Sequence, residues 1–287
     1  MTKIASLPRT AKTGVKPTVI ALHCSGATRS AWRQLERDLG HCFTLIVPDL
    51  IGSGGAAHWA GAHAFRLSDE AKNVVRLIDA ANGPVHLVGH SYGGAVALQA
   101  AIERPTQVAS MTLYEPMALH VLKTIGPDGK VALKEITAVA GDISLFVLSG
   151  DYNAAAKRFF ECWNGEGSWS AMRPEVRDDL VRYIPKVCLE FSAVLNERTP
   201  LAAYRRLNFP ALLLQGERAP DLTQLVARQL ARAMRFASLQ TVYGAGHMGP
   251  FSHATAVSAM MADWIARAEP RFSRPDEDIK PDIDRAA

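Results

Sequence analysis

The sequence predicts an α/β fold: a doubly wound, mostly parallel sheet into which one helical segment is inserted. Short apolar runs rich in β-branched residues alternate with segments of helical periodicity near both ends of the chain. This alternation stops after Pro116 and resumes at Phe209. The residues between, 117–208, are too many for a plain loop and read as helices. We therefore expect a core formed by residues 1–116 and 209–269, with a helical domain inserted between its two parts.

Six apolar runs are the expected strands. Because nearly every residue in them is apolar, rather than every second one, helices should cover both faces of the sheet. Such runs are typical of parallel strands joined by helical crossovers. The expected strands are residues 18–22, 43–47, 85–89, 111–114, 211–215 and 239–243.

Helices are expected between these strands, where apolar residues recur at helical spacing. Ser30 and Ser68 are suitable N-caps for the first two, and Pro105 stops a third over residues 95–103. A further helix is expected over 223–234. The inserted domain contains helical stretches such as 145–147, 154–160 and 176–184. The last helix carries one core-facing stripe, formed by Val257, Met260, Met261, Trp264 and Ile265.

The composition is that of a folded globular protein, with 48% hydrophobic and 21% charged residues and a mean hydropathy of +0.01. Lys and Arg number 32 against 28 Asp and Glu, an excess too small to predict nucleic acid or a membrane surface as a partner. No apolar run has the length of a transmembrane helix or the form of a signal peptide. Residues 270–287 are charged and proline-rich, so we expect a disordered tail there.

The four cysteines are far apart in the sequence and form no CxxC pair, so neither a disulfide framework nor a zinc site is expected. They are Cys24, Cys42, Cys162 and Cys188. We therefore expect a cytoplasmic protein whose partner is a small-molecule substrate. The composition leaves the oligomeric state open.

The sharpest motif is GHSYGG, residues 89–94, at the junction between an expected strand and an expected helix. A G-x-S-x-G sequence in that setting predicts a nucleophile elbow, in which glycines permit a tight turn that lifts the serine from the sheet edge. The helix N-terminus and the next backbone N–H then face a reacting carbonyl. Ser91 is therefore the candidate nucleophile for acyl transfer.

A serine nucleophile needs a histidine as general base, because its hydroxyl is weakly nucleophilic at neutral pH. His247 lies in a glycine-rich loop between the last strand and the last helix, at the strand ends where active sites of open α/β sheets form. His253 falls in the first turn of a helix, which favours a capping role. His86 and His90 lie in or beside the elbow strand and are expected to be packed, hydrogen-bonded core residues. His247 is therefore the candidate base.

An oxyanion hole requires a second backbone N–H besides that of the residue after the nucleophile. The loop that follows the first strand, residues 22–26, is placed to supply it. The expected donors are the backbone amides of Ser25 and Tyr92. His23 is expected to brace this loop.

The chain resembles the α/β-hydrolase family from about residue 18 to 267. The resemblance rests on LHCSGATRSAW, PDLIGSGGA, VGHSYGGAVAL, LLLQGERAPD and GAGHMGP, which occur in the family's order. It implies that residues 117–208 form a helical cap that covers the active site and shapes substrate choice. The sequence departs from the family in two places. His23 and Cys24 stand where a His-Gly pair is usual, and Ala219 occupies the usual position of the catalytic aspartate.

Two carboxylates can replace that missing acid. Glu115 directly follows the fourth expected strand, where some α/β-hydrolases place the acid, and Asp221 lies just beyond the usual position. Both keep the chain order serine, acid, histidine. We favour Glu115 and retain Asp221 as the alternative.

The expected activity is that of a serine hydrolase, which cleaves an ester, thioester or lactone of small to medium, partly apolar substrates through an acyl-enzyme and needs no cofactor or metal. Hydrolysis of a carbon–carbon bond and cofactor-free haloperoxidation also occur on this fold with a serine, and a non-catalytic receptor is the alternative from another class. The run Gly52 to Ala57 formally matches a dinucleotide-binding pattern, but no apolar-periodic helix follows it.

Overall fold

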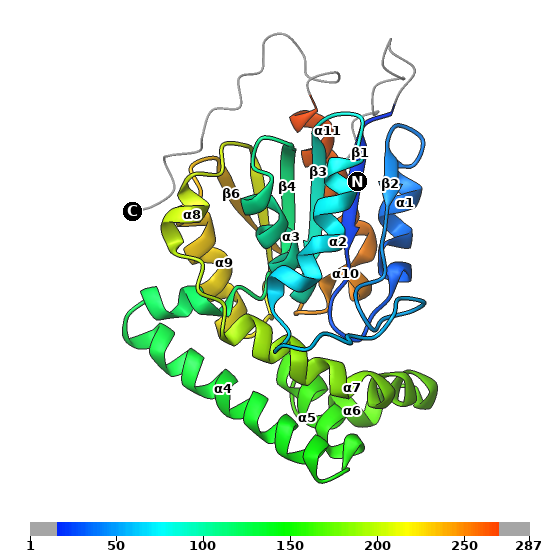
Figure 1. Cartoon of the computed structure of the whole chain (residues 1–287), viewed down its shortest axis with the longest axis vertical. Helices are drawn as coiled ribbons and strands as arrows, with labels where there is room; N and C mark the ends of the chain where they lie inside the picture. Colours follow the sequence, from blue (N-terminus) through cyan, green and yellow to red (C-terminus); the bar gives the residue numbers. More distant parts are fainter. Residues whose placement is uncertain (1–15, 270–287) are drawn as a thin grey trace.

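The structure is a computed structural model that describes residues 16–269. Its centre is a six-stranded, fully parallel sheet in the order β2-β1-β3-β4-β5-β6. The strands are β1 (Thr18–Leu22), β2 (Thr44–Ile46), β3 (Val85–His90), β4 (Val108–Tyr114), β5 (Ala211–Gly216) and β6 (Ala237–Val242). All six expected strands are therefore present, and the predicted fold class is confirmed (Figure 1).

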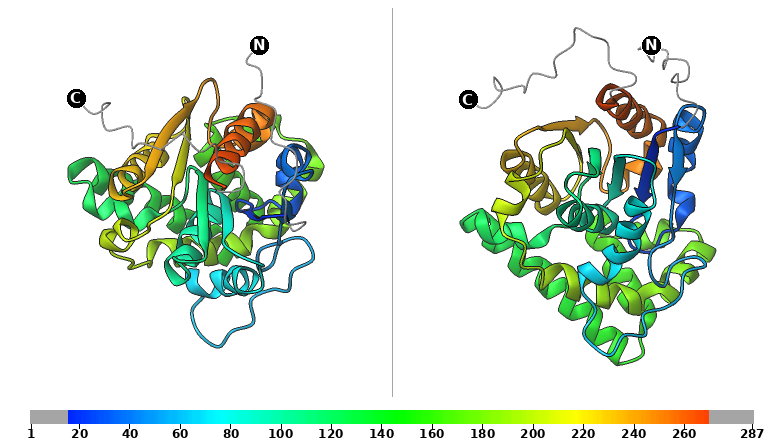
Figure 2. Two further views of the ribbon diagram at one scale, coloured as in Figure 1. Left: turned by 90° about the horizontal axis from the view of Figure 1, so that it is seen from above. Right: turned by 45° about the horizontal axis from the view of Figure 1, so that its top comes forward.

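Helices cover both faces of this sheet, as the continuous apolar runs predicted (Figure 2). On one face, Val19 and Ala21 pack with the helices α1 (Arg33–Leu39) and α11 (Ala254–Ala268). On the other face, Ile20 and Leu22 pack with three helices. These are α2 (Leu67–Asp79), α3 (Tyr92–Glu103) and α9 (Asp221–Ala233). Each strand therefore contributes alternate residues to two separate apolar layers.

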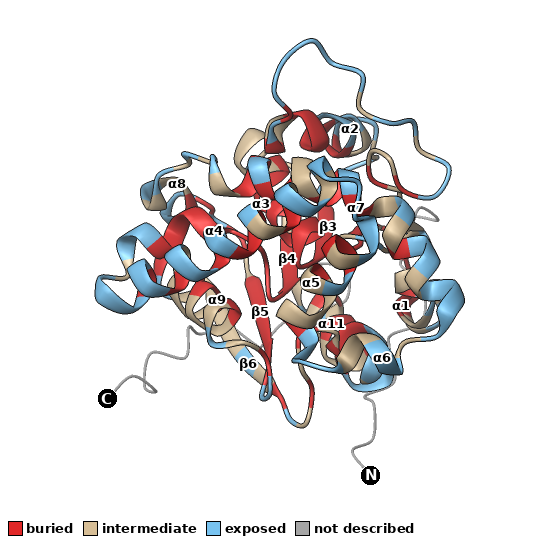
Figure 3. Ribbon diagram, turned by 90° about the horizontal axis from the view of Figure 1, so that it is seen from below, coloured by how far each residue is buried: buried red, intermediate tan, exposed pale blue. Residues whose placement is uncertain are grey.

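The inserted residues form a layer of helices across one end of the sheet (Figure 1). After the short helix η2 (Leu119–Thr124), the layer is formed by α4 (Pro127–Leu148), α5 (Tyr152–Asn164), α6 (Ser168–Ala171) and α7 (Pro174–Leu195). Helix α8 (Leu201–Arg205) follows and lies beside α9 at the side of the core (Figure 1). Seen from this end, the outer faces of the helices are exposed while the strands behind them are buried (Figure 3).

Two stretches of this layer are longer than the sequence predicted. Residues 145–147 are only the last turn of the 22-residue helix α4. Helix α7 begins at Pro174 and continues through Pro185, whereas the expected stretch ended at residue 184. Residues after the proline are buried, among them Lys186 and Phe191, so tertiary packing supports the second half of the helix.

Both expected N-caps are displaced by two residues. Thr28, rather than Ser30, caps the short helix η1 (Arg29–Trp32), because its side chain accepts a hydrogen bond from the Ser30 amide. Helix α2 begins at Leu67, and the Arg66 amide donates to the Asp69 carboxylate at 3.0 Å, so Ser68 is not its cap.

Within residues 16–269, no helix combines the length and apolar character needed to cross a membrane. The expected tail at residues 270–287 lies outside the described part of the chain.

Candidate active site

The candidate site lies at the carboxyl ends of the strands, where the order of the sheet reverses. The chain leaves β1 toward β2 on one side and later enters β3 on the other, so the loops after β1 and β3 diverge from one crevice. Ligands of open α/β sheets bind at such a position. Ser91 follows β3 directly, and the turn that contains Ser25 follows β1.

The backbone at Ser91 has the strained conformation of a nucleophile elbow, with φ 54° and ψ −117°. Gly93 permits the turn, since a Cβ there would lie 2.4 Å from the carbonyl oxygens of both Leu22 and His23. Two backbone hydrogen bonds tie the elbow to β4 and the residues after it: the Ser91 amide donates to the Tyr114 carbonyl, and the Met117 amide donates to the Ser91 carbonyl, both at 3.0 Å. These two main-chain hydrogen bonds therefore hold Ser91 in its strained backbone conformation.

Three side chains form a continuous hydrogen-bonded chain at this elbow. The Ser91 hydroxyl donates to Nε2 of His247 at 3.0 Å, and Nδ1–H of His247 donates to Oε2 of Glu115 at 2.7 Å. These donor assignments follow from the network, in which the carboxylate can only accept. All three residues are at least 95% buried. The structure thus brings together Ser91, His247 and Glu115.

Glu115 is held in place by its backbone and by both carboxylate oxygens. It directly follows β4 with φ 43°, a left-handed conformation. Its second oxygen, Oε1, accepts the Gly216 amide at 2.7 Å, at the end of β5. Asp221, the alternative acid, is exposed at the start of α9. Glu115 is therefore the carboxylate that orients the His247 ring.

The loop that carries His247 follows β6 and is fixed by two side chains that the sequence did not suggest as partners. His90 Nε2–H donates to the His247 carbonyl at 2.9 Å, and the Tyr114 hydroxyl donates to the Gly246 carbonyl at 2.7 Å. Burial lowers the pKa of His90 well below 6.5, so His90 is neutral. The expectation that His90 is a packed, hydrogen-bonded core residue is confirmed.

His86 and His23 also have structural roles. His86 bonds Ser110 at 2.8 Å and Glu269 at 3.1 Å inside the core, as expected. His23 is fully buried, lies 2.8 Å from the Cys24 carbonyl through Nδ1, and accepts the Leu50 amide at 3.1 Å. It therefore connects the loop after β1 to the loop after β2.

The helical layer closes over the site. The Trp163 ring, from α5, stacks on the His247 ring with centroids 4.7 Å apart and planes inclined by 29°. Phe159 lies beside Trp163, and Phe191 of α7 lies beside Phe159. Trp169, another tryptophan of the inserted residues, instead contacts Phe160. Trp163 is therefore the aromatic residue that faces the imidazole.

The two expected oxyanion donors lie at the starts of segments that follow neighbouring strands, β3 and β1. Tyr92 is the first residue of α3, so its N–H has no acceptor within the helix. Ser25 lies in the turn after β1, whose preceding carbonyls approach Gly93 closely. On its other side this turn touches α7, because a Cβ at Gly26 would lie 2.8 Å from Leu180 and 3.7 Å from the Tyr183 ring.

Next to this turn lies a buried group of charged and phenolic side chains, here called the α7 polar cluster. Its members are Glu70, Tyr92, Tyr183, Lys186 and Glu190. The Lys186 ammonium donates to Glu70 at 2.8 Å and to Glu190 at 3.3 Å. Sequence reasoning missed it, because a Lys and a Glu four residues apart on a helix are typical of an exposed ion pair.

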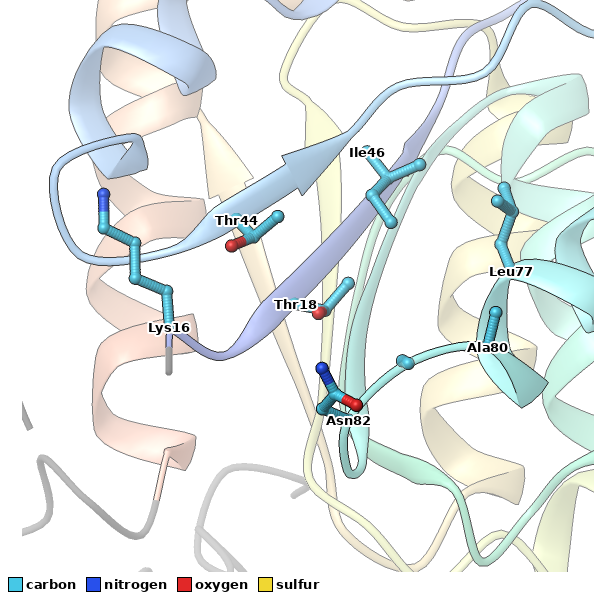
Figure 4. Close-up of a pocket in the computed structure, with 8 residues that line it drawn as sticks. Lys16, Thr18, Thr44, Ile46, Leu77, Ala80 and Asn82 are labelled. Atoms are coloured by element: carbon cyan, nitrogen blue, oxygen red, sulfur yellow. The ribbon is translucent and has the colours of Figure 1, made fainter. Parts of the chain in front are cut away.

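One surface pocket of the described residues, of about 250 Å³, is lined by residues that follow β2 and by residues of α2, Glu70 among them. Another, of about 230 Å³, lies at the opposite end of the parallel strands from Ser91 and is lined by residues of β1 and β2, by the segment before β1 and by residues around the end of α2 (Figure 4). Lys16, Thr44 and Asn82 are among them. The glycine-rich run 52–57 forms turns and precedes no helix until Leu67, so it lacks the helix that a dinucleotide site requires. Residues 16–269 contain no cluster of three or more His, Cys, Asp or Glu side chains suited to a metal ion.

Comparison with known proteins places the chain in a family. Residues 19–260 match the Alpha/beta hydrolase family, and the chain belongs to this family. The resemblance inferred from the motifs is confirmed. The chain is also similar in structure to the enol-lactonase from Burkholderia xenovorans LB400. The TM-score is 0.69, with 17% identity over 88% of this chain and 93% of the other.

Two proteins with similar sequences have different names. Lipase LipV of Mycobacterium tuberculosis is 29% identical over 56% of this chain, and the match spans 54% of LipV, or about half its length. The Magnesium-chelatase 30 kDa subunit of Rhodobacter capsulatus is 26% identical over 87% of both chains.

Proposed function

We propose that the protein is a serine hydrolase that cleaves an ester-type bond, in an ester, thioester or lactone, through an acyl-enzyme. The observation that carries this proposal is the chain of hydrogen bonds from Glu115 through His247 to Ser91, at 2.7 and 3.0 Å. The names of two similar proteins, a lipase and an enol-lactonase, support an ester-type substrate.

In the proposed reaction, Ser91 Oγ attacks the carbonyl carbon while its proton passes to Nε2 of His247. The negative charge that develops on the carbonyl oxygen is stabilised by the backbone N–H groups of Tyr92 and Ser25. Glu115 accepts the Nδ1–H bond, holds the tautomer that leaves Nε2 free to accept, and stabilises the imidazolium. When the tetrahedral intermediate collapses, the bond between the acyl carbon and the alcohol oxygen breaks, and His247 donates its proton to the leaving alcohol.

Deacylation repeats these steps with water. His247 removes a proton from water, the hydroxide oxygen attacks the acyl carbon, and Ser91 leaves with the returned proton. The products are a carboxylic acid and a regenerated serine. No metal or cofactor takes part in the proposal.

Residues 117–208 act in this proposal as a cap that controls access. Ser91 and His247 are 5% and 3% exposed, and Trp163 covers the imidazole, so a substrate can reach the serine only if the helical layer moves. The aromatic series Trp163, Phe159 and Phe191 suits a small or medium substrate with an apolar part.

The test is covalent labelling of the purified protein with an organophosphate or sulfonyl fluoride, followed by peptide mass spectrometry. We expect the adduct on Ser91, and we expect Ser91→Ala to abolish hydrolysis of a panel of chromogenic esters. An adduct on another residue, or full esterase activity in Ser91→Ala, would refute the assignment. Absence of any turnover together with saturable ligand binding would favour the receptor alternative.

A further inference from the structure

The strongest unexplained feature of the described chain is one carboxylate oxygen in the α7 polar cluster. Glu190 is 2% exposed, and its Oε2 atom is buried without a hydrogen-bond partner among residues 16–269. Its other oxygen, Oε1, accepts from the Tyr183 hydroxyl at 2.5 Å and from Lys186 at 3.3 Å. A buried acceptor without a donor costs free energy, more so when it is charged, so a ligand donor there would be favoured.

The other carboxylate of the cluster, Glu70, has hydrogen-bond partners on both of its oxygens. Glu70 accepts from Lys186 and from the Tyr92 hydroxyl through Oε2, at 2.8 and 3.1 Å, and from the Ile51 amide through Oε1, at 2.7 Å. The Tyr183 oxygen also accepts from the Ser53 hydroxyl at 3.3 Å. These bonds join α7 to the core without using Oε2 of Glu190. The unpaired oxygen is therefore not needed to hold the two layers together.

Glu190 lies beside the proposed catalytic machinery. It bonds Tyr183, whose ring lies against Gly26 in the turn that follows Ser25. The next residue along α7, Phe191, belongs to the aromatic series that leads through Phe159 to Trp163 over His247. The pKa of Cys24, in the same turn region, is raised to about 12 by burial and, secondarily, by the charge of Glu190.

We propose that Oε2 of Glu190 binds an N–H or O–H donor of the substrate, remote from the bond that is cleaved. The substrate class is then an ester-type compound that carries an ammonium or hydroxyl group. Two carboxylates and one ammonium leave the ionised cluster with one excess negative charge, which favours the ammonium group over the hydroxyl. This inference rests on the proposed hydrolase activity for the identity of the reacting bond.

The test compares aliphatic esters that differ only in one end group, a methyl, a hydroxyl or an ammonium. The chain between this group and the carbonyl has four to six methylenes, and a second set carries the same end groups on the alcohol side. Hydrolysis is followed by titration of the released acid. For the best length we expect kcat/KM to favour the ammonium ester over the methyl ester by roughly tenfold to a hundredfold, the range for a hydrogen bond to a charged group.

Glu190→Gln should remove most of the preference for ammonium while the methyl ester is still hydrolysed. Glu190→Leu should remove the preference for hydroxyl as well. Glu175→Gln, the same change at an exposed position of α7, is the matched control and should keep the wild-type ratios. An ammonium preference that survives in Glu190→Gln, or the absence of any donor preference in the wild type, would overturn the proposal.

A binding measurement separates this inference from the proposed reaction. Calorimetry with Ser91→Ala and the ammonium ester should show binding that is lost in Ser91→Ala/Glu190→Gln. If esters are cleaved by Ser91 but this difference is absent, the donor site is refuted and the hydrolase proposal stands. If binding depends on Glu190 but no ester is cleaved, the donor site stands and the reaction is refuted. Thermal unfolding of each variant shows whether it is folded.

Discussion

Two buried networks lie side by side in this molecule, and they are constructed differently. In the Ser91–His247–Glu115 chain, both oxygens of the carboxylate are hydrogen-bonded, and each residue follows a strand whose end the sheet fixes. In the α7 polar cluster, side chains from α2, α3 and α7 meet across the boundary of two layers, and one carboxylate oxygen is unpaired. The first network is specified by the backbone of one sheet, and the second by the packing of one layer on another.

The largest expected effect concerns the acid of the first network. Glu115→Gln should lower kcat by about 10⁴-fold with little change in KM, because an amide cannot hold the same tautomer or stabilise the imidazolium as a carboxylate does. Steady-state kinetics on the best chromogenic ester measures this change. Asp221→Asn is the matched variant and should retain nearly full activity. If Asp221→Asn lost activity while Glu115→Gln kept it, the acid would be Asp221, after β5. The contrast between the two networks would then be removed.

The next effect concerns the cation of the second network. Lys186→Met leaves two buried carboxylates without a counter-charge and should lower the free energy of unfolding by about 3 to 5 kcal/mol at neutral pH. Arg182→Met, which removes an exposed ion pair with Asp179 from the same helix, should cost at most about 1 kcal/mol. Denaturant unfolding at fixed pH measures both.

The pH dependence of the Lys186→Met effect provides an additional test. Burial and the charge of Glu190 already raise the pKa of Glu70, while Lys186 opposes that rise. Without the lysine, the folded protein should take up a proton on Glu70 at a higher pH than the unfolded chain does. The loss of stability should therefore be largest near pH 8 and smaller near pH 5. A loss of stability that is equal at pH 8 and pH 5 would show that removing Lys186 does not make Glu70 bind a proton more tightly in the folded protein than in the unfolded chain.

The smallest effect concerns the contact that joins the helical layer to His247. Trp163→Leu removes the stacking on His247, which is worth about 0.5 to 1.5 kcal/mol, and should lower kcat/KM by roughly two- to tenfold. Trp169→Leu should change kcat/KM less, because that ring contacts Phe160 rather than the imidazole. Equal effects of the two substitutions on a series of esters of rising acyl length would contradict the role of Trp163 over the site.

The sheet was predictable because its signals are local. Most strands are nearly continuous apolar runs, and the elbow requires small residues at fixed spacing around Ser91. The choice between Glu115 and Asp221 was not local, since both follow strands that end near the His247 loop. Only the three-dimensional register, in which Glu115 also accepts the Gly216 amide, distinguishes them.

The helical character of the inserted residues was predictable, but the length and packing of the individual helices were not. Pro185 reads as the end of a helix, yet α7 continues to Leu195 because its second half is packed against the core. Lys186 and Glu190 read as an exposed pair, and their burial depends on partners such as Glu70, 116 positions from Lys186 in the chain. Contacts between residues so far apart in the sequence cannot be inferred from the local periodicity of apolar residues.

The position of Glu115 after β4 also bears on how freely this protein can diverge. Because Glu115 bonds His247 from this position, the proposed mechanism needs no acid at Ala219 after β5, and the site uses this region through the backbone N–H of Gly216. A main-chain group is provided by any residue except proline, although a Cβ at position 216 would lie 2.5 Å from the Ala245 carbonyl. In the proposed mechanism, position 219 therefore needs no acidic side chain, and alanine can stand there. The carboxylate of Glu217 in the same turn has a different task, because it accepts the Gly244 amide at 2.8 Å in the segment that leads to His247.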